Sequence, residues 1–345
     1  MYEHTYTSLE VIHVIRETPS AVSLVLKPLN GKLVHYLPGQ FITLVFQTSF
    51  GPKKRSYSIS SSPALNEPLT ITVKRVENGE FSRQLTEQTR TGDILYMEEA
   101  GGRFVLPENP AQYEYLFLAA GSGITPVYSL VKTLLHTTQT TIHLMYSNTG
   151  IAETIFLKHL KALAFEYPDR FRLRFFFSSD ENILERRLSS HLLNRILKEQ
   201  FASVKMNLQV YMCGPFLYMD TAGIILRSFG VPAHQIHTED FHPLPLEELP
   251  KPPDLRAHPV TLLLNGKSVT LEVQYPQSIS KAAQEAGLPV PFSCESGQCG
   301  SCMAKLIEGE IWMAYNEVLT DREITDGLRL TCLGFPINGP VTIQF

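Results

Sequence analysis

Short apolar runs broken by glycine, proline and asparagine dominate the N-terminal third of the chain. Apolar runs of this length, interrupted by such turn-forming residues, are typical of β-strands. They cover residues 8–15, 21–28, 40–47, 55–61, 69–76 and 93–100. A helical segment at residues 81–89 precedes the last run. The pattern predicts an antiparallel β-barrel over residues 1–108.

The pattern changes after Pro110, where apolar strands alternate with amphipathic helices. The predicted strands are residues 113–121, 141–148, 170–179, 208–215 and 235–241, and the helices are residues 125–136, 153–167, 189–200 and 216–230. This alternation predicts an α/β domain over residues 112–241, with a five-stranded parallel sheet covered on both faces. Such sheets bind ligands at the carboxyl ends of their strands. Glycines and polar side chains that follow the strands are therefore candidate binding residues.

Residues 242–258 contain five prolines, which disfavours regular secondary structure and predicts a stiff, extended linker. Beyond the linker, residues 259–345 have their own pattern. Two strands at residues 260–266 and 268–274 are followed by a helix at residues 279–287, a loop rich in glycine and cysteine, and further strands. The mixture indicates a separate α+β domain, so the chain is predicted to be multi-domain.

Composition agrees with several domains. With 345 residues, of which 43% are hydrophobic and 19% charged, the chain can bury more than one core. Residues 259–345 carry five basic and nine acidic side chains, which accounts for the whole net charge of −4. This distribution argues against nucleic-acid binding, which demands a basic face. An acidic domain suits docking on a basic patch of a partner protein. An acidic surface that simply faces solvent explains the distribution equally well.

The N-terminal segment lacks the basic and apolar parts of a signal sequence, and no apolar run approaches the roughly 20 residues of a membrane span. We therefore expect a cytoplasmic protein that binds no membrane. Four of the five cysteines crowd near the C-terminus, which suits metal ligation in a reducing compartment better than disulfides.

The crowded cysteines give the most specific chemical signal in the chain. They are Cys294, Cys299, Cys302 and Cys332, in a C-x4-C-x2-C pattern with a distant fourth. This is the spacing of plant-type [2Fe–2S] ligands. Gly297 and Gly300 let the backbone approach a cluster closely. Structural zinc sites use paired C-x2-C units, and only one such pair is present, so iron–sulfur ligation is preferred over zinc.

Through this loop, residues 259–345 resemble a plant-type ferredoxin domain, and nearly the whole chain resembles the ferredoxin–NADP reductase superfamily. Within it, the chain is most similar to oxygenase reductase components that carry the ferredoxin at the C-terminus. The resemblance implies a β-grasp fold for the last domain. It also implies an enzyme that passes electrons from NADH or NADPH through FAD to a [2Fe–2S] cluster, and on to an oxygenase component as electron-accepting partner.

Residues 55–58 match the R-x-Y-S flavin motif of this superfamily. Arginine offers paired donors to phosphate, tyrosine an aromatic face to the flavin ring, and serine a hydroxyl near the reactive nitrogen. A barrel strand with alternating polar residues would look the same. FAD-binding relatives hold the pyrophosphate on backbone amides at residues 79–82, where a helix cap is a compatible reading. The predicted flavin-binding residues are Arg55, Ser56, Tyr57, Ser58, Lys74, Gly79, Phe81 and Ser82.

Residues 121–126 follow an apolar strand and open a helix. Glycines at such a position admit a dinucleotide phosphate to the helix N-terminus, although a plain strand-to-helix turn is the alternative. A proline replaces the third glycine of the ordinary dinucleotide motif, which is the form found in this superfamily. The predicted nicotinamide-binding residues of this loop are Gly121, Gly123, Thr125 and Pro126.

Further candidates follow the later strands of the predicted sheet. They are Ser178, Cys213, Gly214, Pro215, Glu239 and Phe241. The resemblance places Cys213 beside the nicotinamide carbon that gives up hydride, whereas isolated cysteines are commonly packing residues. It places Glu239 and Phe241 near the flavin, where an exposed acidic turn is the alternative. We assign the chemistry to Ser58, Cys213 and Glu239.

The sequence indicates a slight preference for NADH. NADPH-preferring relatives carry an arginine after the serine at the position of Ser178, and this chain lacks it. Asp180 would repel a 2′-phosphate, whereas Arg186 and Arg187 can reverse the preference. A different class of protein stays open as well: a non-enzymatic redox sensor or electron carrier whose flavin site is vestigial.

Overall fold

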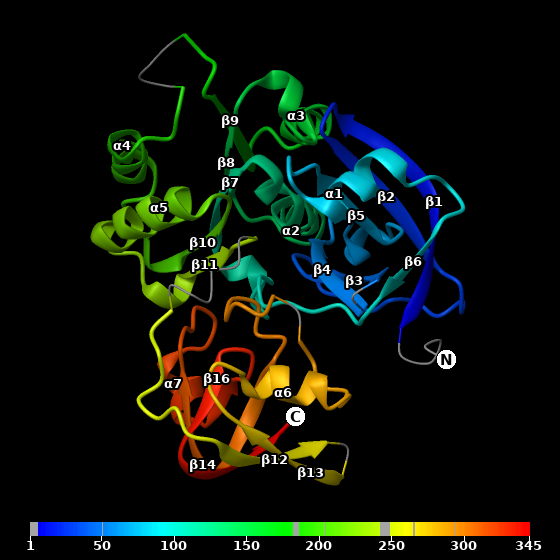
Figure 1. The fold of residues 1–345 in the computed structure, drawn as a ribbon. Helices are drawn as coiled ribbons and strands as arrows, with labels where there is room; N and C mark the ends of the chain where they lie inside the picture. Colours follow the sequence, from blue (N-terminus) through cyan, green and yellow to red (C-terminus); the bar gives the residue numbers. More distant parts are fainter. Residues whose placement is uncertain are drawn as a thin grey trace. The chain divides into compact units, whose positions relative to one another are not determined.

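The computed structural model describes residues 6–345 except residues 50, 182–185, 204, 242–248, 265 and 293. The chain divides into two compact units, Met1–Phe241 and His242–Phe345 (Figure 1). Within the described part of the chain, no helix is both long and apolar enough to cross a membrane.

The first sheet has six antiparallel strands in the order β4-β3-β6-β1-β2-β5. Their bounds are β1 (Thr7–Thr18), β2 (Ala21–Pro28), β3 (Phe41–Thr48), β4 (Gly51–Ser58), β5 (Thr70–Lys74) and β6 (Ile94–Met97). A bridge between Ile59 and Ile71 links the ends of the two outer strands and closes the sheet around a hydrophobic core. The predicted antiparallel barrel is confirmed.

The helical segment predicted at residues 81–89 is divided in the structure. A single α-helical turn, α1 (Glu80–Arg83), continues as a π-helix, η2 (Gln84–Gln88). The amide of Thr89 donates to the carbonyl of Gln84, five residues earlier, at 3.1 Å. The wider turn is the reason why the segment does not form one regular α-helix.

The second sheet has five parallel strands in the order β11-β10-β7-β8-β9. The strands are β7 (Glu114–Ala120), β8 (Ile142–Asn148), β9 (Phe171–Phe177), β10 (Leu208–Cys213) and β11 (Ile236–Glu239). The chain fills one side from β7 to β9 and then returns to β10 on the other side of β7. The connection direction therefore changes between β7 and β10, where doubly wound sheets bind their ligands.

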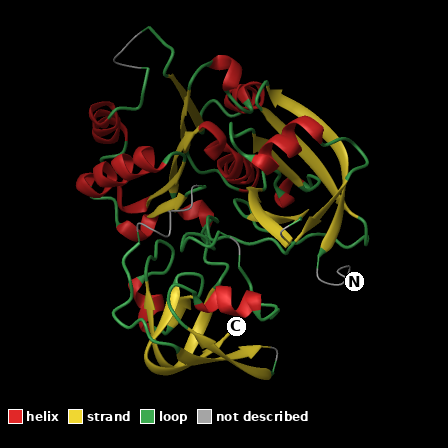
Figure 2. Ribbon diagram, viewed as in Figure 1, coloured by secondary structure: helices red, strands yellow, loops and turns green. Residues whose placement is uncertain are grey.

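Helices cover both faces of this sheet, as the continuous apolar strands predicted (Figure 2). They are α2 (Ile124–Thr137), α3 (Leu157–Glu166), α4 (Ser190–Gln200) and α5 (Phe216–Phe229). Buried side chains of α2 and α3 share one core with the sheet, and those of α4 and α5 share the other. Helix α3 begins later than predicted, because a short turn at Ile151–Glu153 and a left-handed Phe156 (φ 60°) precede it.

The second unit is an α+β fold on a five-stranded mixed sheet in the order β13-β12-β16-β14-β15. Its elements are β12 (His258–Leu264), β13 (Lys267–Val273), α6 (Ile279–Glu285), β14 (Met303–Met313), α7 (Asp321–Thr325), β15 (Leu328–Leu330) and β16 (Gly334–Gln344). Only β12 and β16 pair in parallel. Ile279 and Ala283 of α6 pack into the core of the sheet, which is the arrangement expected of a β-grasp domain.

Part of the predicted linker, residues 242–248, lies outside the described residues. In the part that follows, the Asp254 carboxylate accepts hydrogen bonds from Arg256, from Nε2 of His258 at 2.8 Å and from the backbone amide of Asn338 at 3.3 Å. These bonds attach residues 254–258 to the β-grasp unit.

Candidate functional site

Ser58, Cys213 and Glu239, the three residues to which we assign the chemistry, come together in the structure. Cys213 ends β10 and Glu239 ends β11, and the two are register partners in the parallel sheet. Ser58 ends β4 of the barrel, and its hydroxyl lies beside the Glu239 carboxylate. The fold thus brings the R-x-Y-S motif to the carboxyl ends of two sheet strands.

Two buried polar atoms at this point lack a hydrogen-bond partner among the residues that the structure describes. Oγ of Ser58 and Oε2 of Glu239 are buried and accept or donate no hydrogen bond within the described chain. Each such atom costs about 1–3 kcal/mol unless a bound group satisfies it. Burial raises the pKa of Glu239 to about 8, and the nearby Ser58 hydroxyl acts in the opposite direction. The unsatisfied atoms fit a site for a polar ring system.

Cys213 is fully buried. Burial raises the pKa of its thiol well above the ordinary value, and the charges of Glu239 and Asp240 add to the effect. Its sulfur is therefore a neutral thiol at physiological pH. A neutral, compact side chain at the end of β10 can contact an aromatic ring without introducing charge.

The raised pKa of Glu239 predicts a pH-dependent stability. The carboxyl titrates near pH 8 in the folded protein and near pH 4.5 in the unfolded chain. Through this group the folded state binds more protons between these values, so the contribution of Glu239 to the free energy of unfolding should fall as pH rises through the window, by an amount on the order of a few kcal/mol. Burial lowers the pKa of His143 and His237 to about 4, and these groups act in the opposite direction below pH 6.5, so the net decline is expected above that value. Below pH 4.5 and above pH 8 this group should contribute no slope.

Thermal unfolding measured from about pH 7 to about pH 9 checks this expectation. Glu239→Gln should flatten the decline, because glutamine does not titrate. Glu99→Gln, which changes an exposed glutamate, serves as the control and should retain the wild-type slope. Equal slopes for wild type and Glu239→Gln would contradict the assignment.

The other flavin-motif residues meet helix α1. The Arg55 guanidinium stands over the Phe81 ring, 5.3 Å from its centroid, and Phe81 stacks on Phe46 at 4.2 Å. Burial raises the pKa of Tyr57, and the Arg55 charge opposes this shift. Ser56 shares a hydrogen bond with Thr43 at 3.1 Å. Arg55 and Phe81, predicted from separate motifs, thus lie side by side.

Ser82 holds the turn that precedes α1. Its hydroxyl accepts from the Val76 amide at 3.1 Å and donates to the Gly79 carbonyl at 3.2 Å. A Cβ on Gly79 would lie 2.4 Å from this hydroxyl, so a larger residue there would have to displace the hydroxyl and break these two bonds. Gly79 is the N-cap residue, and Ser82 is not. The backbone amides of this turn, rather than the Ser82 side chain, are the groups available to a phosphate.

The predicted nucleotide loop packs between β7 and β10. A Cβ on Gly123 would lie 2.0 Å from the Cys213 carbonyl oxygen, and a Cβ on Gly214 would lie 2.9 Å from the Cβ of Ala120. Both glycines are therefore needed for packing between the two loops. Gly121 is different, because it has a left-handed φ of 56° and the atom nearest to a Cβ placed on it would be Nζ of Lys74, at 3.9 Å. A cation beside an open glycine fits an approaching phosphate.

Two further residues of this loop face the protein interior. Thr125 is 2% exposed, and its hydroxyl donates to the Ser122 carbonyl at 3.0 Å. Pro126 is buried in the first turn of α2. Thr125 therefore shapes the loop, and its hydroxyl could donate to a ligand only by giving up this bond, although it can still accept one.

The remaining predicted residues border the same edge of the sheet. The Ser178 amide donates to the Asn148 carbonyl at 2.9 Å, Pro215 precedes α5, and Phe241 is 41% exposed.

The structure adds three residues that the sequence interpretation missed. Ser147 Oγ, Asn148 Nδ2 and Tyr218 Oη are buried and lack a hydrogen-bond partner within the described ranges. Ser147 and Asn148 end β8, and Tyr218 lies in the first turn of α5 with its hydroxyl near Ser147. For Ser147 and Asn148, their position at the end of a predicted strand could have identified them as candidate binding residues. Tyr218 carries no such signal, because it sits in an apolar helical pattern.

In the second unit the four cysteines form two neighbouring pairs. The thiol of Cys299 lowers the pKa of Cys294, and the thiol of Cys332 lowers the pKa of Cys302. Among the described residues, no three His, Cys, Asp or Glu side chains converge as ligands of one metal ion. Two thiol pairs fit two irons with two ligands each better than one tetrahedral zinc.

Backbone amides also point at these sulfurs. The Ser296 amide donates to Sγ of Cys294 at 3.4 Å, and the Ser301 amide donates to Sγ of Cys299 at 3.5 Å. Gly297 and Gly300 both have left-handed backbones, with φ of 74° and 75°. A Cβ on Gly297 would lie 2.8 Å from the Tyr315 carbonyl oxygen, so packing within the protein already requires this glycine.

Three protein families match consecutive parts of the chain. The oxidoreductase FAD-binding domain matches residues 9–106, the oxidoreductase NAD-binding domain matches residues 117–223, and the 2Fe-2S iron-sulfur cluster binding domain matches residues 262–336. These matches confirm FAD, a nicotinamide dinucleotide and a [2Fe–2S] cluster as the cofactors.

Curated relatives match over nearly the full length. The ferredoxin reductase component of 3-ketosteroid-9-alpha-monooxygenase from Mycolicibacterium smegmatis is 32% identical over 98% of this chain and 96% of its own. The chain belongs to the family of oxygenase reductase components. A component of the 1,2-phenylacetyl-CoA epoxidase of Escherichia coli is 30% identical over 99% of this chain and 98% of its own.

Solved structures show the same fold. Phthalate dioxygenase reductase is 23% identical, covers 99% of each chain and has a TM-score of 0.63. An intact type IV self-sufficient cytochrome P450 monooxygenase is 21% identical with a TM-score of 0.75, over 99% of this chain and 41% of that one. The reductase is an NAD(P)H-dependent flavin and iron–sulfur oxidoreductase, and its family supports this activity over an electron carrier with a vestigial flavin site.

Proposed function

We propose that this reductase delivers single electrons to a separate oxygenase component. The observation that carries the proposal is the order of sites along one chain: Ser58, Cys213 and Glu239 meet in the first unit, and two thiol pairs form in the second. When bound, FAD supplies the conversion from hydride transfer to single-electron transfer. The related monooxygenase and epoxidase components support an oxygenase as the partner.

In the flavin site, we assign Arg55 to a phosphate, Tyr57 to the ring face and Ser58 to a polar edge of the ring. The backbone amides of residues 79–82 complete the flavin phosphate contacts. We assign Lys74, which the sequence predicted for the flavin and whose Nζ lies beside Gly121, to the pyrophosphate of the nicotinamide dinucleotide. Glu239 is largely protonated at neutral pH, because burial raises its pKa to about 8. It can therefore donate a hydrogen bond at the ring edge, which an ionised carboxylate cannot do.

In the nicotinamide site, Cys213 contacts the ring and Gly121 admits the pyrophosphate. Ser178 lies where the adenosine ribose belongs. The unsatisfied atoms of Ser147, Asn148 and Tyr218 at the same sheet edge support a further polar contact with the dinucleotide. In the second unit, the four predicted cysteines hold the cluster in pairs.

The proposed domain boundaries are residues 1–108 for FAD, 112–241 for the dinucleotide and 259–345 for the cluster, with 242–258 as linker. The acidic last domain suits a basic docking patch on the partner. Clustered free cysteines support a cytoplasmic location, because a reducing compartment keeps thiols available for iron.

Anaerobic titration of the purified protein with each dinucleotide tests the proposal. NADH should bleach the flavin absorbance, and kcat/KM with cytochrome c as acceptor should be severalfold higher for NADH than for NADPH, because Asp180 repels a 2′-phosphate. A preference for NADPH of about tenfold would instead assign the 2′-phosphate to Arg186 or Arg187. Flavin absorbance that neither dinucleotide changes would contradict the reductase activity of the chain.

A further inference from the structure

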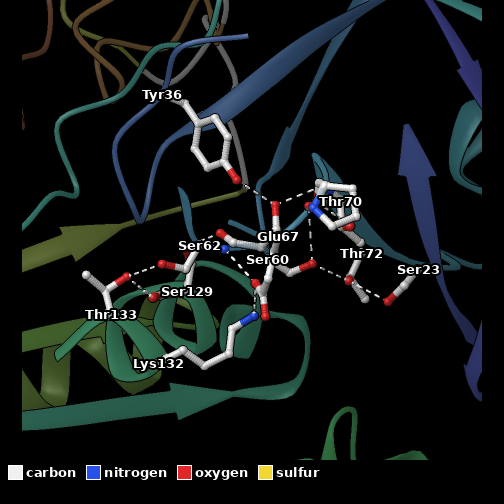
Figure 3. Close-up of polar contacts among 12 residues, drawn as sticks. Ser23, Tyr36, Ser60, Ser62, Glu67, Thr70, Thr72, Ser129, Lys132 and Thr133 are labelled. Carbon is white, nitrogen blue, oxygen red and sulfur yellow. Dashed lines mark hydrogen bonds and ion pairs between the residues drawn. The ribbon is translucent and has the colours of Figure 1, made fainter. Parts of the chain in front are cut away.

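A buried set of polar contacts joins the barrel to helix α2 (Figure 3). We call this set the polar seam. Its members are Ser61, Ser62, Glu67, Ser129, Lys132 and Thr133. The first three belong to the segment between β4 and β5, and the last three belong to α2. All six lie in the first unit.

The bonds of the polar seam cross from one domain to the other. Lys132 Nζ forms an ion pair with Oε2 of Glu67, and the same oxygen accepts from the Ser62 amide at 2.7 Å. The hydroxyls of Ser62 and Thr133 share a hydrogen bond at 2.7 Å. Ser129 Oγ donates to the Ser61 carbonyl at 2.6 Å.

The seam is buried. Ser62 and Ser129 have no exposed surface, and Lys132 and Thr133 are each 7% exposed. On the barrel side the bonds continue, since Ser61 Oγ shares a hydrogen bond with the Tyr36 hydroxyl at 2.8 Å. Hydrogen bonds between Ser60, Thr72 and Ser23 then cross the barrel strands (Figure 3).

The polar seam lies next to both cofactor motifs in the chain. Ser62 follows Ser58 of the flavin motif by four residues, and Ser129 follows Gly123 of the nucleotide loop by six residues on the helix that this loop opens. A second hydrogen bond of this kind lies near Cys213, where the Tyr211 hydroxyl donates to the Val105 carbonyl at 2.8 Å. Both halves of the hydride-transfer site are therefore held by bonds a few residues away.

Hydrogen bonds and ion pairs restrict movement between the barrel and helix α2 more than apolar contacts do. Apolar surfaces of similar shape can slide, whereas a buried ion pair or hydroxyl pair loses its partner when the joint shifts by an ångström or two. Hydride transfer requires the donor carbon of the nicotinamide and the reactive nitrogen of the flavin to meet at close range, and a misplacement of about 1 Å can lower such a rate by about 100-fold. A fixed position of the barrel relative to helix α2 therefore favours hydride transfer.

We propose that Glu67, Lys132, Ser62 and Thr133 are positioning residues that set the distance between the flavin and nicotinamide sites. The inference rests on the proposed assignment of those two sites. It predicts a slower reduction of the flavin when the seam is broken, even when both cofactors still bind.

Helix α2 offers a matched pair of variants. Thr133 donates to the Ser129 carbonyl at 2.8 Å and Thr138 donates to the Leu134 carbonyl at 2.7 Å, each four residues earlier, and both are buried. Only Thr133 also bonds to the barrel. Thr133→Val therefore removes the contact across the seam, whereas Thr138→Val, at the C-cap residue of α2, removes a similar bond to the helix and a long bond from the Thr140 amide. Lys132→Met, which breaks the ion pair, is the stronger variant.

Stopped-flow reduction of the FAD-loaded full-length protein by saturating NADH or NADPH is the measurement. We expect a reduction rate about tenfold lower for Lys132→Met, a smaller loss for Thr133→Val and none for Thr138→Val, with FAD content unchanged. Hydrogen exchange supplies a readout independent of activity: amides of residues 59–62 should exchange faster in both seam variants and at the wild-type rate in Thr138→Val.

Each outcome decides the question. Wild-type reduction rates in both seam variants, or an equal loss in Thr138→Val, would show that the seam only stabilises the fold and would overturn the inference. If Lys132→Met does not fold, the comparison of Thr133→Val with Thr138→Val still tests the inference. Wild-type protein that neither dinucleotide reduces would instead overturn the proposed function, and the inference with it.

Discussion

Cys299→Ser is expected to abolish iron binding while leaving reduction of the flavin by NAD(P)H intact. Cys299 is paired with Cys294, and serine cannot supply the thiolate that an iron–sulfur cluster requires. The flavin and nicotinamide sites lie in Met1–Phe241, whereas the cysteine pairs lie in His242–Phe345. Loss of one pair should therefore not disturb the first unit.

Iron analysis and two acceptors distinguish the steps. Wild type should contain two irons per chain and no stoichiometric zinc. The variant should contain none, should reduce ferricyanide at the wild-type rate, and should reduce cytochrome c only at background. Ser268→Ala, an exposed position on β13, controls for substitution within the same unit and should keep the iron. Zinc in the wild type, or iron retained in Cys299→Ser, would overturn the ligand assignment.

The sequence predicts the architecture well because the local pattern carries it. The six short strands and the strand–helix alternation reflect the periods of buried faces, and both sheets appear as expected. Element limits follow less well, since they depend on hydrogen bonds that periodicity does not encode. The π-helix at Gln84–Gln88 and the late start of α3 at Leu157 are examples.

The candidate site shows the same division. Cysteine spacing and the R-x-Y-S motif are local features, so the sequence indicates Cys294 and Ser58 directly. The contact that requires a particular residue is often made with a residue far away in the sequence. Gly123 is required by the carbonyl of Cys213, and Gly297 by the carbonyl of Tyr315, rather than by a ligand alone. Nothing near Tyr218 in sequence reveals that its hydroxyl lies beside Ser147.

The polar seam is the clearest case of what the sequence hides. Ser62 and Thr133 are 71 residues apart, and each by itself is an ordinary hydroxyl residue in a loop or helix. Lys132 reads as a solvated position on an amphipathic helix, yet it is buried against Glu67. Only the packing of barrel against helix turns these residues into a connected set.

A truncated chain ending at Phe241 is expected to keep FAD and to reduce ferricyanide, but to lose cytochrome c reduction. The compact first unit ends at this residue, and every residue assigned to the flavin and dinucleotide lies within it. The four cysteines that we assign to the cluster are removed with the second unit. Electrons should then leave only from the flavin, which serves a small dye better than a protein acceptor.

Adding the second unit as a separate fragment, residues 242–345, should restore only part of the cytochrome c reduction. Removing the covalent connection forfeits the effective concentration that linkage supplies, on the order of millimolar, whereas the added fragment is present at about micromolar concentration. The restored rate should rise linearly with added fragment and stay below that of the intact chain. If the truncated chain loses FAD, the flavin site depends on the second unit and the boundary at Phe241 is wrong. If it reduces cytochrome c at the full rate, electrons leave from the flavin, and the cluster of this reductase is not the exit.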